Sequence, residues 1–509
     1  MGIFFRRIPD YILPLLAGLL IASPFLFPIL FPLAWVAFVP VFWLLRAGGS
    51  LRRAFLFGWL MGVVVNLLGF HWLVYTIKVF GGFSYAVSSF IFLIFIALEA
   101  LQFSLFLLLV HRFGFGPLHL FPALFWVAIE FWFPHLFPWH LANSQSYFLS
   151  LTQSADLVGP YGTSFLIVWL NTTLYTALVH PDGEAKTSLR PAAISSALVI
   201  TVFFYGQFRL STVTAEMGAA PKLSVAAVQG NIDIQLKWQI DQIKNNLKSY
   251  QDLTKKTQGA NLVIWPETAV EEWLPEKTNQ LPPRLFPPLN PATSHFIFGV
   301  RSYRGKAASP EFKAFNSAFL ADRQGRVLNR YHKQVLLAFG EYIPFSTLFS
   351  KLPGVPSLVG GFSEGEGPRT LDLPGGIRVA PLICYEDLIP ALSRRFVAEK
   401  RANLLVNLTN DAWYGNTVAP WQHARLAQWR AIETRRNLVR VTNTGLTTVI
   451  NPKGEMLQTL PTFSSGVLTA KVEIMEGETF YVRFGDWFAW MITFVSLGIV
   501  LWRWRKQSE

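Results

Sequence analysis

Cysteine and charge are both scarce in this sequence. The chain of 509 residues has one cysteine, Cys384, which excludes a disulfide framework and any zinc site built on several thiolates. Only 15% of the residues are charged, against about 25% in soluble globular proteins. Hydrophobic residues make up 52% of the chain, and the mean hydropathy is +0.35. The composition therefore indicates a membrane protein, or a protein with a large membrane part.

Nucleotide- and nucleic-acid-binding motifs are also missing. A net charge of +13 would suit a nucleic-acid partner, but the basic residues stand in short clusters beside apolar runs, which is typical of membrane orientation. The glycine-rich run at 360–367 does not match a phosphate-binding P-loop. We therefore expect no nucleic-acid partner, no metal and no cofactor.

Eight apolar segments approach the roughly 20 residues that cross a bilayer core. Seven precede residue 210 and one closes the chain: 11–27, 30–45, 54–77, 86–110, 120–137, 163–180, 191–207 and 484–502. Prolines interrupt the first two segments, so their boundaries are the least defined. No small-x-small cleavage site follows the first segment, so we expect a retained anchor rather than a cleaved signal peptide.

The distribution of Lys and Arg predicts the orientation of these spans. Alternate loops carry basic clusters such as Arg52 and Arg53, whereas the loops between them carry little more than Lys78 and Arg209. The positive-inside rule then places both termini in the cytoplasm and the long seventh loop outside. Three parts are expected: a transmembrane bundle at 1–210, an external domain at 211–480, and a final helix with a cytoplasmic tail at 481–509.

The long loop alternates strand and helix patterns. Predicted strands cover 223–229, 261–266, 295–302, 314–321, 403–408 and 438–442, and predicted helices cover 236–257, 388–400 and 420–436. Apolar strands that alternate with amphipathic helices indicate a layered α/β domain.

Three titratable residues follow separate strands of this domain. Glu267 ends W-P-E, Lys333 ends Y-H-K, and Cys384 begins C-Y-E at a strand-to-helix turn, where backbone N–H groups favour a thiolate. Taken singly, they fit a solvated carboxylate, a surface lysine and a buried structural cysteine. Taken together, they supply the base, the fixed cation and the nucleophile that acyl transfer needs.

The order of these motifs resembles the Glu–Lys–Cys triad of the nitrilase superfamily, over about 220–475. The N-L-T-N-D-A-W-Y-G run at 407–415 and the helix pattern at 422–433 strengthen the resemblance. With its membrane segments, the chain resembles the membrane-bound apolipoprotein N-acyltransferase family of that superfamily. The resemblance implies a membrane α-helical bundle of about eight transmembrane helices plus an α/β nitrilase-like four-layer α-β-β-α sandwich.

The resemblance also implies an activity. An acyl chain would move from a phospholipid, such as phosphatidylethanolamine, to the α-amino group of the N-terminal S-diacylglyceryl-cysteine of an apolipoprotein. Glu267 would act as general base, Cys384 would carry the acyl group as a thioester, and Lys333 would stabilise the oxyanion in a ping-pong mechanism. The expected location is the bacterial inner membrane, with a periplasmic catalytic domain, and a monomer is expected.

Four further residues match positions near the active site of that family: Trp238, Glu341, Tyr385 and Glu386. Glu341 would tune proton transfer, or would be a structural hydrogen-bonding carboxylate. The segment 344–362 places apolar residues among Gly, Pro and Ser, which suggests a lid that contacts acyl chains, or ordinary loop packing.

Two other functions stay open at this point. A membrane-tethered amidase or nitrilase acting on a small C–N substrate would use the same triad. A transporter with a large external domain predicts an internal repeat, which the sequence does not show, and it leaves the triad unexplained.

Overall fold

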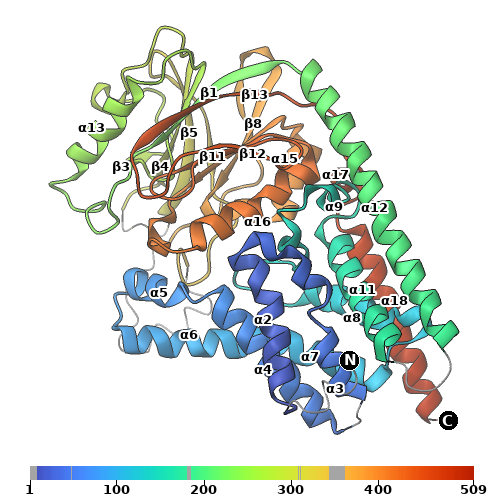
Figure 1. Ribbon diagram of the computed structural model, residues 1–509. Helices are drawn as coiled ribbons and strands as arrows, with labels where there is room; N and C mark the ends of the chain where they lie inside the picture. Colours follow the sequence, from blue (N-terminus) through green and yellow to red (C-terminus); the bar gives the residue numbers. More distant parts are fainter. Residues whose placement is uncertain are drawn as a thin grey trace. The chain divides into compact units, whose positions relative to one another are not determined.

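The chain forms two compact units. The computed structural model describes residues 9–46, 49–179, 185–307, 309, 311–342 and 361–508. The helical unit comprises Met1–Val74, Ser84–Thr212 and Phe484–Glu509, and the α/β unit comprises Tyr75–Phe83 and Val213–Arg483 (Figure 1). A stretch that the sequence assigns to the N-terminal bundle, Tyr75–Phe83, thus packs with the α/β unit, where the Phe80 ring lies 4.7 Å from that of Trp413.

Apolar helices build the helical unit. They are α2 (Ile12–Leu26), α3 (Val39–Arg46), α4 (Leu51–Gly69), α5 (Leu73–Gly81, which continues into the α/β unit), α6 (Tyr85–Glu99), α7 (Leu101–Phe113), α8 (Phe121–Trp132), the short α9 (Leu149–Thr152) and α10 (Ala155–Val158), α11 (Pro160–Val179), α12 (Ala185–Ala219, which likewise continues) and α18 (Trp487–Ser508). Among the described residues, five helical stretches are long and apolar enough to cross a membrane: Pro28–Leu45, Leu51–Gly69, Tyr85–Phe113, Leu189–Ala219 and Trp487–Lys506. The chain is therefore a membrane protein with several candidate spans.

Two expected spans end earlier than the sequence predicts. The expected continuous span at 54–77 is wrong beyond Gly69, because α4 ends there and a separate helix, α5, begins at Leu73. The expected span at 120–137 ends at Trp132, because Phe133 precedes a proline and takes an extended conformation (φ −69°, ψ 127°).

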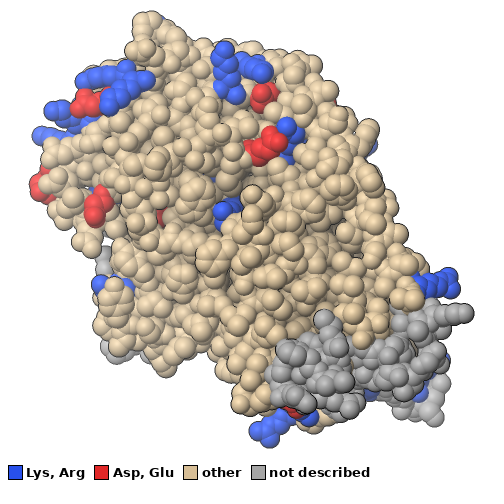
Figure 2. Space-filling model, viewed as in Figure 1, with Lys and Arg blue, Asp and Glu red and all other residues tan. Residues whose placement is uncertain are grey.

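The surface of the helical unit suits a lipid environment. Large apolar side chains are exposed along α6 and α18, including Phe90, Leu93, Phe494 and Leu501. Figure 2 shows wide stretches of surface with no charged side chain. Helices satisfy their own backbone hydrogen bonds, so such faces can contact hydrocarbon.

Two sheets form the centre of the α/β unit. The first has the order β13-β1-β2-β4-β5-β6, with β3 paired to β4, and the second has the order β12-β11-β10-β9-β8-β7. The strands are β1 (Lys222–Gln229), β2 (Leu262–Ile264), β3 (Val270–Pro275), β4 (His295–Arg304), β5 (Lys313–Asp322), β6 (Val327–His332), β7 (Leu371–Leu373), β8 (Ile377–Ile383), β9 (Leu404–Thr409), β10 (Leu438–Thr442), β11 (Thr448–Ile450), β12 (Met456–Thr459) and β13 (Gly466–Glu473). The parallel strands β1, β2 and β4 of one sheet, and β8, β9 and β10 of the other, match the predicted α/β alternation.

Helices cover the outer faces of the two sheets. One buried cluster joins apolar residues of both sheets, and β1 and β5 approach β10 and β8. On the outer side of the first sheet, α13 (Ile243–Thr254) packs its Tyr250 ring 5.2 Å from that of Trp265. On the second sheet, α15 (Pro390–Lys400) contacts β8 and α16 (Ala419–Thr434) contacts β10 (Figure 1). The unit is an α/β sandwich with helices outside and sheets inside.

Local differences from the sequence predictions concern segment ends. The predicted helix at 236–257 begins only at Ile243, because residues before it form turns that direct the Lys237 side chain into the interior. The expected lid at 344–362 lies, except for its last two residues, outside the described residues.

Candidate active site

Glu267 lies just beyond β2. The Trp265 N–H donates to the Ile297 carbonyl at 2.9 Å, which extends the sheet pairing by one residue before the chain leaves the sheet. Gly299 on the neighbouring β4 passes beneath this turn, and a Cβ there would stand 2.4 Å from the Pro266 oxygen and 2.6 Å from the Glu267 Cα. A glycine at 299 is therefore what lets the carboxylate-bearing turn sit on the sheet.

Lys333 follows β6 and is almost fully buried, with 1% of its surface exposed. Its backbone N–H donates to the Asn316 carbonyl on β5 at 2.9 Å. Its Nζ lies 2.7 Å from Oε2 of Glu341. A buried ammonium requires such a partner, because desolvation of an unpaired charge is very costly.

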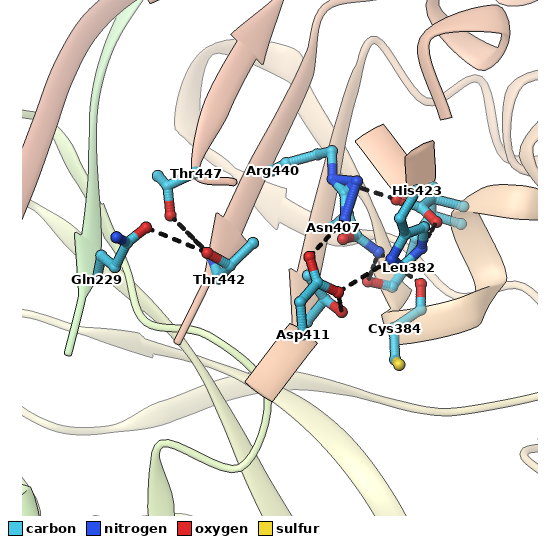
Figure 3. Close-up of polar contacts among 11 residues, drawn as sticks. Gln229, Leu382, Cys384, Asn407, Asp411, His423, Arg440, Thr442 and Thr447 are labelled. Atoms are coloured by element: carbon cyan, nitrogen blue, oxygen red, sulfur yellow. Dashed lines mark hydrogen bonds and ion pairs between the residues drawn. The ribbon is translucent and has the colours of Figure 1, made fainter. Parts of the chain in front are cut away.

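Cys384 follows β8 and begins a short 3₁₀ turn, Cys384–Leu388. Its φ of +53° lies in the left-handed region, which non-glycine residues rarely adopt and which often marks functional turns. The Asn407 amide donates to the carbonyls of Leu382 (3.2 Å) and Cys384 (3.0 Å), and the sulfur points away from this polar cluster (Figure 3). The turn is held through its backbone, and Cys384 as a residue is partly exposed.

Hydrogen bonds link the carboxylates around Lys333. The Asn316 side-chain amide donates to Oε1 of Glu267 at 2.7 Å and to Oε1 of Glu341 at 3.1 Å. Glu386 accepts from the Tyr331 hydroxyl at 2.8 Å and from the backbone N–H groups of Gln334, Val335 and Ile383. These bonds fix the orientation of each carboxylate.

Lys333 is the electrostatic centre of the group. Burial by itself would lower the pKa of Lys333, but the negative charges of Glu341, of Cys384 as thiolate, of Glu267 and of Glu386 together raise it above its ordinary value. The ammonium therefore keeps its proton at any physiological pH. Burial raises the pKa of Glu386 to about 7, against the lowering effect of Lys333 and the three backbone donors.

Burial raises the pKa of both the Cys384 thiol and the neighbouring Glu267 carboxyl. Burial raises the pKa of Cys384 well above its ordinary value, the Glu267 charge raises it further, and Lys333 opposes the shift. Burial also raises the pKa of Glu267, whereas Lys333 lowers it and Glu341 raises it. A base is therefore needed to form the thiolate, and the raised pKa of Glu267 makes this carboxylate a stronger base than a solvated one.

The structure brings five of the seven sequence-derived site residues into one electrostatic group: Glu267, Lys333, Glu341, Cys384 and Glu386. The other two lie beside it. Tyr385 is the buried neighbour of Cys384 in the chain. Trp238 is 38% exposed, and its ring lies 4.4 Å from the Arg301 guanidinium and 5.5 Å from Nζ of Lys237.

Two further residues escaped the sequence analysis. Asn316 stands within the buried strand β5, where a polar side chain in an apolar run is the only signal. Lys237 is buried, and its Nζ donates to the Glu267 carbonyl at 3.2 Å. Burial lowers the pKa of Lys237 to about 8. Among the described residues, no group of three or more His, Cys, Asp and Glu side chains is arranged to hold a metal ion.

Comparisons with known proteins match both units. Residues 17–173 match the family model described as the apolipoprotein N-acyltransferase N-terminal domain, and residues 224–479 match the carbon-nitrogen hydrolase model. A solved amidase from Nesterenkonia is similar over 52% of this chain and 95% of its own, with 20% identity and a TM-score of 0.36.

Full-length relatives cover both units at once. The apolipoprotein N-acyltransferase of Geobacter metallireducens is 34% identical over 99% of this chain and 97% of its own length. That of Bdellovibrio bacteriovorus is 30% identical over 98% of this chain and 95% of its own. The expected combination of a helical membrane region with a nitrilase-like α/β sandwich is confirmed, and the chain belongs to the apolipoprotein N-acyltransferases of the nitrilase superfamily.

Proposed function

We propose that this acyltransferase works through a thioester on Cys384. A phospholipid of the phosphatidylethanolamine type gives up an acyl chain, and the α-amino group of the S-diacylglyceryl-cysteine at an apolipoprotein N-terminus receives it. The observation that carries the proposal is that the Asn316 amide bridges Glu267 and Glu341, and that Glu341 contacts the buried Lys333 ammonium at 2.7 Å. The Lys333 charge lowers the pKa of both Cys384 and Glu267 against the effect of burial. Nucleophile, base and oxyanion partner are thus within one electrostatic group.

The first half-reaction forms the thioester. Glu267 takes the Cys384 proton while the sulfur attacks the ester carbonyl of the phospholipid. The negative charge that develops on the carbonyl oxygen is stabilised by the Lys333 ammonium and by a backbone N–H near Tyr385. The C–O bond then breaks, Glu267 returns the proton to the departing alkoxide, and a lysophospholipid leaves.

The second half-reaction transfers the acyl chain to nitrogen. The neutral α-amine attacks the thioester carbonyl and passes a proton to Glu267, which hands it to the departing Cys384 sulfur. The products are an amide and the resting thiol. An ester donor supplies the energy of both steps, so the cycle requires no nucleotide.

The remaining residues support these steps. Glu341 fixes Lys333 through the 2.7 Å contact and shares the Asn316 amide with Glu267, so it orients both groups. Glu386 ties the turn after β8 to the segment after β6. Trp238, exposed beside the buried Lys237, is positioned to contact substrate.

The amidase alternative uses the same triad but leaves half of the chain without a role. Its soluble counterparts need no membrane helices, whereas the acyltransferase relatives match this chain over nearly its whole length. We therefore favour a lipid donor over a small C–N substrate.

For the topology, we propose eight spans with both termini in the cytoplasm and residues 211–480 in the periplasm, in the bacterial inner membrane. The alternation of basic clusters between loops supports this orientation. We further propose that the enzyme acts as a monomer.

The experiment that tests the proposal is intact-mass spectrometry after incubation of the purified enzyme with phospholipid alone. One acyl group should appear on Cys384, and hydroxylamine should remove it. Cys384→Ser should show no thioester, and Glu267→Gln should acquire the acyl group much more slowly. A Ser variant that still acylates a diacylated lipopeptide would show that the thioester mechanism is wrong.

A further inference from the structure

A buried cluster of four charges lies behind the Cys384 turn. His423 Nε2 is 2.8 Å from Oδ1 of Asp387, and His423 Nδ1 is 3.0 Å from Oδ1 of Asp411. Arg440 closes the set at 3.5 Å from Oδ2 of each aspartate (Figure 3). The side chains of Asp387, Asp411 and Arg440 are fully buried, and that of His423 is 5% exposed. The mechanism described above uses none of the four.

The cluster joins four separate segments of the α/β unit. Asp387 belongs to the same 3₁₀ turn as Cys384, three residues further along. Asp411 begins the turn Asp411–Tyr414, His423 lies on α16, and Arg440 lies on β10. The Asp411 side chain also packs against Gly445, and a Cβ added at Gly445 would stand 2.2 Å from Oδ2 of Asp411. The cluster therefore fixes the Cys384 turn against three neighbours.

The hydrogen-bond geometry determines the charge of His423. Both ring nitrogens lie within hydrogen-bond distance of carboxylate oxygens, and an ionised carboxylate only accepts. Both nitrogens must therefore carry a proton, which makes the ring an imidazolium. Burial by itself would lower the pKa of His423, but Asp387 and Asp411 outweigh it and the opposing Arg440, and raise it to about 9.

Stability by itself does not account for such a cluster. Replacing a buried ion group with apolar residues is often neutral or stabilising, so a buried ion group is weak evidence of added stability. Fixing one conformation of the surrounding chain is the alternative role for such a group. The cluster described here includes Asp387, which belongs to the Cys384 turn. The first residue of that turn, Cys384, is strained at φ +53° and carries the thiol. Asn407 holds the carbonyl of that residue, and the Asp387–His423 contact holds the other end of the turn.

We propose that His423, in its doubly protonated form, is a positioning residue for Cys384: it ties the turn that presents the thiol to the Asp411–Tyr414 turn, and loss of its proton misaligns the nucleophile. The inference rests on the proposed thioester role of Cys384. The groups that face His423 are Asp387, Asp411, Arg440 and the Tyr414 ring at 6.1 Å.

The test measures the single-turnover rate of Cys384 acylation against pH, with phosphatidylethanolamine vesicles as donor. The wild-type rate should fall as the pH rises past about 9, where His423 loses its proton. Titration of the thiol would give the opposite sign, since more thiolate means faster attack. Lys333 does not titrate in this range, because the surrounding carboxylates raise its pKa further.

Two variants of the cluster and one control variant separate positioning from folding. His423→Gln should acylate about 10- to 100-fold more slowly, as expected for a small misplacement of a reacting atom, with unchanged KM for phospholipid and no fall at alkaline pH. Asp411→Asn removes a charge that raises the pKa of His423, so the alkaline fall should move to lower pH. His295→Gln, outside the site on β4, should match the wild type in both respects.

The outcomes distinguish this inference from the proposed function. A wild-type enzyme that never gains an acyl group on Cys384 contradicts the proposed function. A wild type that is acylated but shows no alkaline fall overturns the inference, and so does an Asp411→Asn variant whose fall stays at the wild-type pH. If thermal unfolding shows that His423→Gln does not fold, the pH profiles of the wild type and of Asp411→Asn still decide whether the inference holds.

Discussion

At the residue scale, Lys333 holds the site together. Its ammonium balances buried carboxylates at 341, 267 and 386, so its removal would leave several negative charges close together in a poorly solvated place. The same charge stabilises the oxyanion in the proposed mechanism. Loss of Lys333 should therefore affect both the resting site and the transition state.

Lys333→Met keeps the length of the side chain and removes its charge. We expect Cys384 acylation to fall by about 100- to 1000-fold, the usual effect of removing one oxyanion partner. Lys333→Arg should recover little, because a planar guanidinium does not fit the place of an ammonium. Single-turnover acylation followed by mass spectrometry measures the loss, and Lys256→Met, at an exposed position, serves as the control.

Asn316 sets the pH at which Glu267 can act. Glu267 must be ionised to accept a proton, and burial already raises its pKa, whereas the Asn316 hydrogen bond lowers it. Asn316→Ala should raise that pKa further and move the acidic fall of the acylation rate to higher pH. A pH–rate profile checks the direction of the shift. Asn329→Ala, whose side chain bonds the Thr370 carbonyl elsewhere, should leave the profile in place, and an unshifted Asn316→Ala profile would contradict this role.

At the element scale, the site is built from strand ends. The ends of β2, β6 and β8 present Glu267, Lys333 and Cys384. Before Glu267 and Cys384 the strand is visible in the sequence as an apolar run, whereas β6, with the sequence V-L-N-R-Y-H, is not. The sequence does not show in the same way which strands pair with each other. Gly299 matters because β2 and β4 pair in parallel with Ile264 opposite Ile297, and no local pattern specifies that register.

Gly299→Ala should therefore damage the site without a change of any charged group. The added methyl would stand 2.6 Å from the Glu267 Cα, so the turn must move or the strand must shift. We expect a lower melting temperature and slower Cys384 acylation, by about tenfold or more for a displacement near 1 Å. Gly218→Ala, where a Cβ meets nothing within 4 Å, is the matched control. Equal acylation rates in the two variants would mean that the turn tolerates displacement.

The α/β layering was predictable from the sequence, and local motifs were enough to propose Glu267, Lys333 and Cys384 as a triad. The groups that pack around these three residues were not predictable. Apolar alternation and the motif order around Glu267, Lys333 and Cys384 are local signals. Asp387, Asp411, His423 and Arg440 come from four separate segments, so their meeting depends on tertiary packing that no local pattern reports. The predicted helix at 236–257 began too early for a similar reason, since the buried contact between Lys237 and the Glu267 carbonyl overrides helix propensity.

At the scale of the whole molecule, a membrane-spanning unit and an α/β unit share one chain that crosses between them more than once. Residues Tyr75–Phe83 leave the helical unit to pack with the α/β unit, and the chain returns to the helical unit at Phe484. The exposed apolar faces of α6 and α18 suit lipid. The proposed orientation then places the α/β unit on the periplasmic side.

The orientation can be tested with single introduced thiols, because Cys384→Ser removes the only natural one. Lys256→Cys, exposed in the α/β unit, should react with a membrane-impermeant maleimide in intact spheroplasts. Lys506→Cys, exposed near the end of α18, should react only after the membrane is opened. The reverse pattern of labelling would show that the proposed topology is inverted.

Because Cys384 is the one cysteine of the chain, titration of sulfhydryl groups measures the amount of unacylated enzyme. A thiol-specific alkylating agent can react only at Cys384, so under the proposed mechanism the sulfhydryl content that disappears equals, mole for mole, the enzyme activity that is lost. Enzyme molecules that hold the thioester intermediate would resist the agent, since their sulfur is already acylated. The fraction of enzyme that resists alkylation at steady state would then give the share of each catalytic cycle spent as the thioester. The measurement requires no label on either lipid.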